Sequence, residues 1–467
     1  MNSSELQALL PEVVALIEAK MPYGAALAMQ SGGLSIRVDN REQQASRNPE
    51  SSGVVLTAAN GYYLEEYATT TLDRAGLLAE ARAWVAGLVL PPPAGPPLAI
   101  DPGPPLRGSW TTPMQIDPAT MSLQDKFARV TARQAQAKAL GGRVANATVA
   151  YNESVQETVF ANQSRVLHQN LTRLRLTTTL LVRDAAGNIQ YDWDTAGGSL
   201  GCELFDQVDS PAYPRSLAAL HESALALLTA ARIEPGVYDC ICAPDVSGTV
   251  AHESFGHGVE TDIFLKERAL AADYLGQRMA GAEVNMFDDP TLPGAYGSYF
   301  FDDEGTLARP VVIIDDGVFV SGISDLYSAA RLGIARTGNG RRESFDRKAY
   351  ARMSNTYFRA GSTPLAAMIA GVDHGIYLSQ LSSGMEDPKN WGIQLVMHYG
   401  REIRHGQFTG RVFPQVGMTG SVPEVLAGIS QVGSDFAVDT GFCGKGHKEW
   451  VRISSGGPHL RLRARLS

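Results

Sequence analysis

Cysteine is scarce in this sequence: Cys202, Cys240, Cys242 and Cys443 are the only four among 467 residues. Cys240 and Cys242 lie two apart in an apolar run. In a strand they would share a face, so they could hardly bridge each other. Four thiols in a chain of this length are typical of free or metal-bound cysteines and exclude a disulfide framework as the basis of the fold.

Long apolar runs are also missing. No run reaches the roughly 18 residues that a membrane-spanning helix needs. The first residues, Met1 to Glu5, lack the basic start and the apolar stretch of a signal peptide. We therefore expect a protein that is not exported, has no membrane partner and works in the cytoplasm.

Basic residues do not outnumber acidic ones. Lys and Arg total 40 against 49 Asp and Glu, so the formal net charge is −9. An acidic chain is a poor counterion for a phosphate backbone, which argues against nucleic acid as the main partner. Hydrophobic residues make up 44% of the chain, which is ample for two or three domains with their own cores.

Proline is concentrated in one stretch. Residues 91–105 hold eight of the 25 prolines, a density that no helix or central strand tolerates. Together with Glu234-Pro235-Gly236, this stretch divides the chain into predicted units: an N-terminal α+β domain (1–92), a proline-rich linker (93–116), a middle domain of helices and antiparallel strands (117–234) and a β-rich C-terminal domain (235–467). The expected fold class is α+β.

Hydrophobic periodicity places the main elements. Helices are expected at about 4–20, 72–90, 120–140 and 213–232, and a run of antiparallel strands at 143–196. Near the end of the chain, arginines alternate with apolar residues over 460–465, which predicts a terminal strand with one solvated face.

Residues 237–260 carry the most informative motif. Val237–Cys242 reads as a short apolar strand, and Asp245 or Ser247 can cap the helix that follows. That helix contains His252-Glu253-Ser254-Phe255-Gly256-His257. A strand, a capped turn and a helix with His-Glu and a second histidine is the context in which zinc peptidases hold a metal.

The two histidines are five residues apart instead of the usual four. In a regular α-helix this spacing separates them by about 140°, which cannot converge on one ion. Either they are two unrelated histidines, or one π-helical turn returns His257 to the face of His252. Gly256 would make that distortion easier.

A catalytic zinc ion takes three ligands from the protein, so a third ligand must come from elsewhere. Cys443 is the candidate, because glycines flank it in an expected loop and Lys445 could favour its thiolate. The alternative is that Cys443 is a small buried hydrophobic residue, as most lone cysteines are.

These motifs together resemble the TldD/PmbA family of metallopeptidases. The resemblance rests on the histidine motif with Gly258 and Glu260, on Cys443-Gly444-Lys445, and on four segments between them: residues 303–306, 315–317, 337–341 and 352–356. It is dense from about 236 to 446 and weaker before. Because the zinc motif is intact, the chain resembles the catalytic, TldD-type member of the family.

The resemblance implies a zinc-dependent peptidase with Zn²⁺ as cofactor. His252, His257 and Cys443 would bind the metal, and Glu253 would act as the general base on the zinc-activated water. Glu260 would either orient His257 or be a solvated carboxylate. The substrate would be an unfolded segment or a small peptide, including precursor peptides that the enzyme trims. A dimer is expected, with a TldE/PmbA-type paralogue or with itself.

Three further residues have two open interpretations. Arg352, Asn355 and Thr356 would line a groove for an extended peptide, or they would only stabilise a turn. His447 is a candidate extra proton donor. The alternative function is a non-catalytic scaffold or regulator of the gyrase-modulator type, in which the zinc is structural and closed by a fourth residue.

Overall fold

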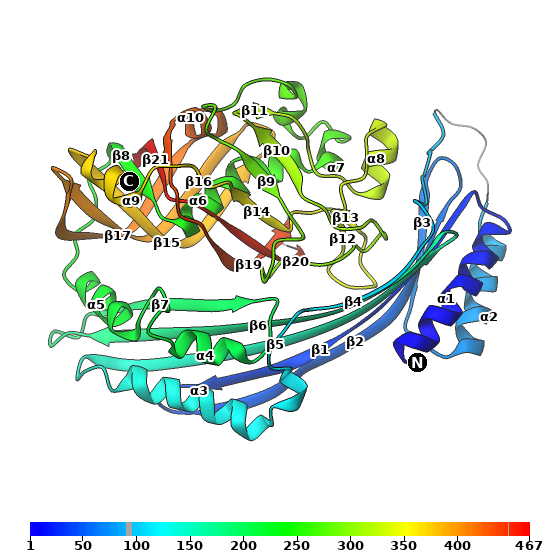
Figure 1. Ribbon diagram of the computed structural model, residues 1–467, viewed down its shortest axis with the longest axis horizontal. Helices are drawn as coiled ribbons and strands as arrows, with labels where there is room; N and C mark the ends of the chain where they lie inside the picture. Colours follow the sequence, from blue (N-terminus) through cyan, green and yellow to red (C-terminus); the bar gives the residue numbers. More distant parts are fainter. Residues whose placement is uncertain (90–95, 447) are drawn as a thin grey trace.

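A computed structural model describes residues 1–89, 96–446 and 448–467 of the chain. Its helices and strands are labelled in Figure 1. Two sequence predictions fall outside the described residues. One is the first part of the proline-rich stretch, residues 91–95, with the boundary predicted at 92–93, and the other concerns His447. Helices combine with three larger sheets, which confirms the predicted α+β class.

A seven-stranded sheet dominates the first half of the chain. Its order is β3 (Leu64–Thr69), β2 (Gln43–Ala59), β1 (Tyr23–Val38), β5 (Val144–Asn162), β6 (Arg165–Arg183) and β4 (Leu106–Thr111), with β7 (Ile189–Gly198) also paired to β6. Strands β1 and β5 pair antiparallel over fourteen residues. The units predicted at 1–92 and 117–234 therefore share one sheet, and β4 lies in the range predicted as a linker.

The helices of this half follow the predicted pattern closely. They are α1 (Ser3–Glu18), α2 (Arg74–Gly87), the 3₁₀ turn η1 (Pro118–Thr120), α3 (Leu123–Lys138), α4 (Glu203–Asp209) and α5 (Leu217–Leu227). In α1, Asn2 and Glu5 form a capping box, and the predicted apolar stripe is buried against the sheet. The helix predicted at 213–232 is shorter, because Ser216 caps it and it ends at Leu228.

The second half forms two further six-stranded sheets and several short elements. One sheet has the order β11 (Val318–Phe319), β10 (Val311–Asp315), β9 (Met286–Asp288), β14 (Asn355–Phe358), β20 (Lys448–Gly457) and β19 (Ala437–Lys445). The other has the order β17 (Gln407–Ser421), β16 (Gly392–Arg404), β15 (His374–Asp387), β8 (Gly236–Cys242), β21 (Leu460–Leu466) and β18 (Ile429–Val432). The short elements are η4 (Leu270–Tyr274), α7 (Thr261–Phe264), α8 (Leu326–Leu332), α9 (Leu365–Ala370), α10 (Val422–Ala427) and the pair β12 (Gly340–Arg341) and β13 (Tyr350–Ala351).

Two sequence predictions are confirmed in the third sheet. Strand β8 coincides with the predicted apolar strand before the histidine motif. Strand β21 has the alternating burial expected of the arginine-rich terminal segment, with its leucines buried. Strand β17 pairs with β21 as well as with β16, so this sheet closes on itself.

Helix α6 (Pro244–Ala251) lies between the second and third sheets and belongs to the largest hydrophobic core. A Cβ at Gly248 would fall 2.1 Å from the backbone nitrogen of Gly456, so α6 contacts β20 almost backbone to backbone. The predicted caps are wrong: Ala243 occupies the cap position and Pro244 starts the helix. Asp245 instead accepts a hydrogen bond from the Leu381 backbone nitrogen at 3.0 Å.

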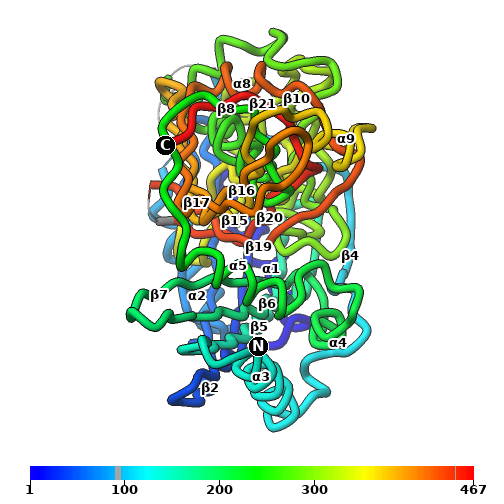
Figure 2. The backbone as a smooth tube through the Cα atoms, turned by 90° about the vertical axis from the view of Figure 1, so that its left-hand side faces the viewer, coloured from blue at the N-terminus to red at the C-terminus, as the bar shows by residue number. Residues whose placement is uncertain are grey.

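The second half rests on the concave face of the long first sheet (Figure 1). Figure 2, turned by 90°, shows the same stacking, with β19 and β20 on the side that faces β6 and β7. Helices α1 and α3 lie outside this contact. None of the described helices has the length and apolar character needed to cross a membrane.

Candidate metal centre

The histidine motif begins where helix α6 changes its winding. Residues His252–Gly256 form a π-helical turn, η2, and the backbone nitrogen of His257 donates to the carbonyl oxygen of His252. The i→i+5 bond adds one residue to the turn. It brings the two imidazole rings together, with their centroids 5.0 Å apart. The predicted π turn is confirmed.

Gly256 is needed in this turn for space and not for conformational freedom. Its φ of −67° and ψ of −51° are ordinary helical values, so the conformational reason predicted for the glycine is wrong. A Cβ at this position would lie only 2.2 Å from the Sδ atom of Met353. The glycine therefore allows Met353 to pack directly against the turn.

Cys443, near the C-terminal end of the chain, lies close to the two histidines. It lies on strand β19, opposite Val451 of β20, and not in the loop that its flanking glycines predicted. Its Sγ atom is 3.2 Å from Nε2 of His252 and 3.4 Å from Nε2 of His257. The three donor atoms all lie within 4.8 Å of one another.

This geometry fits a tetrahedral zinc ion. Zinc binds thiolate sulfur at about 2.3 Å and imidazole nitrogen at about 2.0–2.1 Å, which at tetrahedral angles places sulfur and nitrogen about 3.5 Å apart. The separations of 3.2 and 3.4 Å are close to this value. His252 and Cys443 are buried, with 6% and 3% of their surfaces exposed, while the His257 side chain is 19% exposed, so the site is shielded from solvent on most sides.

The electrostatics of the cluster also favour a cation. Burial alone raises the pKa of the Cys443 thiol, but His257 and His252 lower it well below its usual range. Burial lowers the pKa of His257, yet the Cys443 thiolate and Glu260 raise it well above the ordinary value. The site therefore holds a thiolate that attracts positive charge, which a metal ion can supply in place of protons.

Glu260 supports His257 from behind. Its Oε2 atom is 3.3 Å from Nδ1 of His257 and 3.1 Å from Nζ of Lys445, and its Oε1 atom is 3.4 Å from Nε of Arg352. Only 1% of the residue is exposed, which excludes the solvated carboxylate considered from the sequence. A carboxylate on Nδ1 leaves Nε2 free for a metal and holds the ring in place.

Arg352 holds the backbone of Cys443, another of the three candidate ligands. Its Nη2 atom donates to the carbonyl oxygen of Cys443 at 2.8 Å, and its Nη1 atom donates to that of Glu449. The arginine thus ties together the two strands, β19 and β20, on which Cys443 is held. It also pairs with Glu260, so one buried guanidinium connects the surroundings of Cys443 and His257.

The three residues predicted as substrate contacts do not line a groove. Arg352, Asn355 and Thr356 are fully buried. Asn355 donates to the carbonyl oxygen of Asp289 at 2.6 Å, and Thr356 donates to Oδ2 of Asp288 at 2.9 Å. The physical reason is that β14 pairs on both sides, with β9 and β20, and is covered on both faces. The residues are structural, as the alternative interpretation held, but Asn355 and Thr356 stabilise a strand and not a turn.

A cavity of about 240 Å³ opens beside His252 and Glu253. The second half contributes α6, β15, β19 and β20 to its walls, and the first sheet contributes β6 and β7. Its lining includes Arg175, Trp193, Asp194, Thr195, Asp245, Thr249, Gln380, Asp439 and Phe442. The sequence analysis missed the first-sheet residues, because no local signal connects β6 and β7 to a motif more than fifty residues away.

Glu386 of β15 is a second carboxylate that sequence reasoning missed. Its Oε2 atom accepts a hydrogen bond from the Gly258 backbone nitrogen at 3.1 Å. Burial, and after it the charge of Glu253, raise the pKa of Glu386 to about 8. Nothing in the sequence around Glu386 distinguishes it from an ordinary strand residue, since only the fold brings it near the histidine motif.

Comparison with known proteins shows the family to which this chain belongs. The sequence profile of the PmbA/TldA metallopeptidase C-terminal domain matches residues 235–465. A metalloprotease of Methanothermobacter thermautotrophicus is 32% identical over 321 residues, which cover 68% of this chain and 69% of the relative. A zinc metalloprotease TldD homolog of Saccharolobus solfataricus is 26% identical over 314 residues, covering 67% and 69%.

A solved structure shows the same fold over almost the whole chain. TldE from Thermococcus kodakarensis superposes with a TM-score of 0.74, covering 98% of this chain and 99% of TldE. The sequence identity is 15%, so this likeness concerns the fold alone. It extends to the first half of the chain, where the sequence resemblance is weaker.

Proposed function

Because this chain belongs to the TldD/PmbA metallopeptidase family, we propose that it is a zinc-dependent peptidase. His252, His257 and Cys443 hold the metal, and Glu253 moves protons. One observation carries the proposal: three donor atoms lie within 4.8 Å of one another, beside a cavity that Glu253 also lines.

The donor set suits a catalytic ion better than a structural one. A structural zinc site is normally closed by four protein ligands, whereas a catalytic site has three and keeps one position open. Within the described residues, the metal-ligating cluster consists of two histidines and one cysteine only. When bound, zinc supplies a Lewis acid that activates water and polarises a peptide carbonyl.

Three residues of the chain have the other roles in the proposed mechanism. Glu253 follows His252 directly and faces the cavity, where it accepts a proton from the attacking water and passes it to the leaving amine. Glu260 keeps the His257 ring oriented. Arg352 fixes the backbone at Cys443, so the cysteine stays close to the two histidines of the helix.

The substrate class follows from access to the site. His252 and Cys443 are buried, and His252 and Glu253 line a cavity of about 240 Å³, which is too small for a folded domain. The substrate is therefore an unfolded segment or a small peptide, including a precursor peptide that is trimmed. The family relationship further suggests a dimer, with a TldE/PmbA-type paralogue or with a second copy of this chain.

The decisive experiment incubates peptide mixtures with the purified chain, alone and together with a paralogue from the same source. We expect about one zinc per chain by elemental analysis, and cleavage products by mass spectrometry that disappear when a chelator is added. A chain without transition metal, or cleavage that continues in chelator, would contradict the zinc mechanism. Bound zinc without cleavage under any condition would favour the scaffold alternative.

A further inference from the structure

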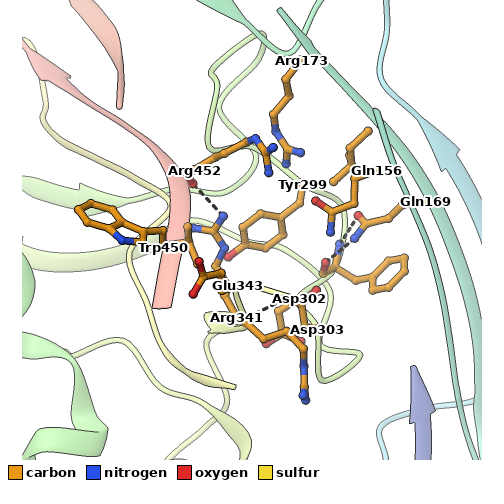
Figure 3. A pocket seen from close by; sticks show the side chains of 14 residues that line it. Gln156, Gln169, Arg173, Tyr299, Asp302, Asp303, Arg341, Glu343, Trp450 and Arg452 are labelled. Atoms are coloured by element: carbon orange, nitrogen blue, oxygen red, sulfur yellow. Dashed lines mark hydrogen bonds between the residues drawn. The ribbon is translucent and has the colours of Figure 1, made fainter. Parts of the chain in front are cut away.

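A second, smaller cavity lies between the first sheet and the second half of the chain (Figure 3). Its volume is about 40 Å³, and it shares no lining residue with the cavity at the metal centre. Four arginines line it. Arg342 pairs with Glu66, and the other three come from three separate elements: Arg173 of β6, Arg341 of β12 and Arg452 of β20. In Figure 3 the guanidinium groups of Arg173 and Arg452 lie side by side.

In the described part of the chain, the hydrogen-bond acceptors of Arg173, Arg341 and Arg452 are neutral. Arg173 donates to the carbonyl oxygens of Tyr296 and Ser298 at 2.8 and 2.9 Å. Arg341 donates to the carbonyl oxygens of Met353 and Arg452. Arg452 donates to Oγ of Ser154 at 2.8 Å. None of these contacts supplies a counter-charge.

Within the residues that the structure describes, two nitrogens of the Arg173 and Arg452 guanidinium groups lack a hydrogen-bond acceptor, as does Nε of Arg342. Nη1 of Arg173 and Nε of Arg452 have no hydrogen-bond partner among the described residues. Arg173 is 3% exposed and Arg341 is 8% exposed, so bulk water does not solvate them freely. Burial, and after it the charges of Arg452 and Arg341, lower the pKa of Arg173 to about 9. At neutral pH the three like charges remain and repel one another.

Three carboxylates also line the cavity: Asp302, Asp303 and the exposed Glu343. Asp303 acts on Arg341 and Arg173 through its charge, but within the described residues none of the three carboxylates forms an ion pair with Arg173, Arg341 or Arg452. Oδ2 of Asp302 accepts from the Gly340 backbone nitrogen at 2.9 Å, and Oδ2 of Asp303 accepts from that of Arg342 at 2.8 Å. Both aspartates lie at the opposite end of the group from Arg173 in Figure 3. Burial also raises the pKa of Asp302 to about 6, which weakens its negative charge near neutral pH.

We propose that this cavity binds one small oxyanion of the phosphate or sulfate class, which joins the first sheet to the second half of the chain. A buried water needs about 10–15 Å³ on the same measure, so 40 Å³ holds a few waters or one small anion and excludes a peptide or a nucleotide. Guanidinium groups bind oxyanions through paired N–H donors, and two such donors are unused here. The site does not depend on the proposed peptidase activity.

The test uses the full-length, zinc-loaded protein in a buffer free of phosphate and sulfate. Calorimetric titration with sodium phosphate should give about one site per chain, and phosphate should raise the unfolding midpoint in a saturable way. Sodium chloride at the same ionic strength should do so much less. The variant Arg452→Gln should bind phosphate at least tenfold more weakly, and Arg173→Gln likewise if it folds.

Arg183→Gln is the matched control, because Arg183 is an exposed residue on the same strand, β6, as Arg173. It should bind phosphate like the parent. The zinc content of all three variants should stay at the parent level, which separates this test from that of the metal centre. No saturable phosphate effect in the parent protein, or equal binding by Arg452→Gln, would show that the cavity holds water only and overturn the proposal.

Discussion

At the scale of single residues, Glu253 and its neighbour His252 have different proposed roles. His252 approaches Cys443, whereas Glu253 faces the open cavity and is not one of the clustered donors. We expect Glu253→Gln to keep its zinc and its fold but to lose peptide cleavage by about 10²–10⁴-fold, the usual contribution of a general base. Rates with one peptide and zinc content by elemental analysis measure both effects. Glu283→Gln, at an exposed position, is the control, and parent-level cleavage by Glu253→Gln would rule out the role.

Cys443 and Cys202 make a matched pair of buried cysteines. Cys443 lies among the histidines, while Cys202 is in a core of the first half, with its Sγ atom 3.8 Å from the Tyr151 hydroxyl. We expect Cys443→Ala to lower zinc occupancy and abolish cleavage, because a thiolate ligand is lost. Cys202→Ala should leave both nearly intact. Full zinc occupancy in Cys443→Ala would remove it from the ligand set.

At the scale of elements, the geometry of the π turn η2 depends on the lack of a side chain at Gly256. Gly256→Ala places a Cβ against Met353, so either the methionine or the turn must move. We expect weaker zinc binding, since a displaced turn carries His257 away from the other two donors. Competition with a chromogenic chelator measures the zinc affinity.

Two further variants sharpen this test. The double variant Gly256→Ala with Met353→Ala should recover much of the zinc affinity, because the obstructing side chain is gone. Gly87→Ala is the control, since a Cβ there meets nothing within 4 Å. If Gly256→Ala binds zinc as tightly as Gly87→Ala, the packing of Met353 does not set the geometry of the turn.

At the scale of the whole molecule, the cavity beside the metal centre gathers carboxylates from both halves of the chain. Asp194 comes from β7, Asp245 from α6 and Asp439 from β19. Asp439 is exposed to solvent in the open cavity, but the surrounding protein and, after it, the charges of Asp245 and Asp194 raise its pKa from 3.8 to about 7, an effect that solvent in the cavity partly screens. The proximity of these groups depends on how the first sheet packs against the second half.

This raised pKa predicts a pH dependence of stability. Between pH 3.8 and about 7 the folded chain keeps a proton on Asp439 that the unfolded chain has released. The free energy of unfolding therefore decreases as the pH rises through this window. Asp439→Asn should flatten that decrease and should gain stability relative to the parent near pH 8. Denaturant unfolding of the zinc-loaded proteins from pH 5 to 8 measures it, with the exposed Asp273→Asn as control. An unchanged slope in Asp439→Asn would disprove the assignment.

The local features of this protein can be predicted from its sequence. The apolar stripe predicted α1, the alternation of arginine and leucine predicted β21, and the five-residue spacing of His252 and His257 predicted a π turn. These features follow from hydrogen bonds and side-chain periodicity within a few residues, which a sequence displays directly. The family resemblance came from the same short segments.

The contacts between groups that are distant in the chain depend on the tertiary structure. It places Cys443 in a strand against the histidines, buries Arg352 as the support of that strand, and makes the first sheet one wall of the cavity. It also joins the two predicted N-terminal units in one sheet through β1 and β5. Such contacts join residues far apart in the chain, 191 positions in the case of His252 and Cys443, and depend on how whole sheets pack. Local spacing carries no information on that packing. The residue types of the site could therefore be read from the sequence, but their neighbours in the folded chain could not.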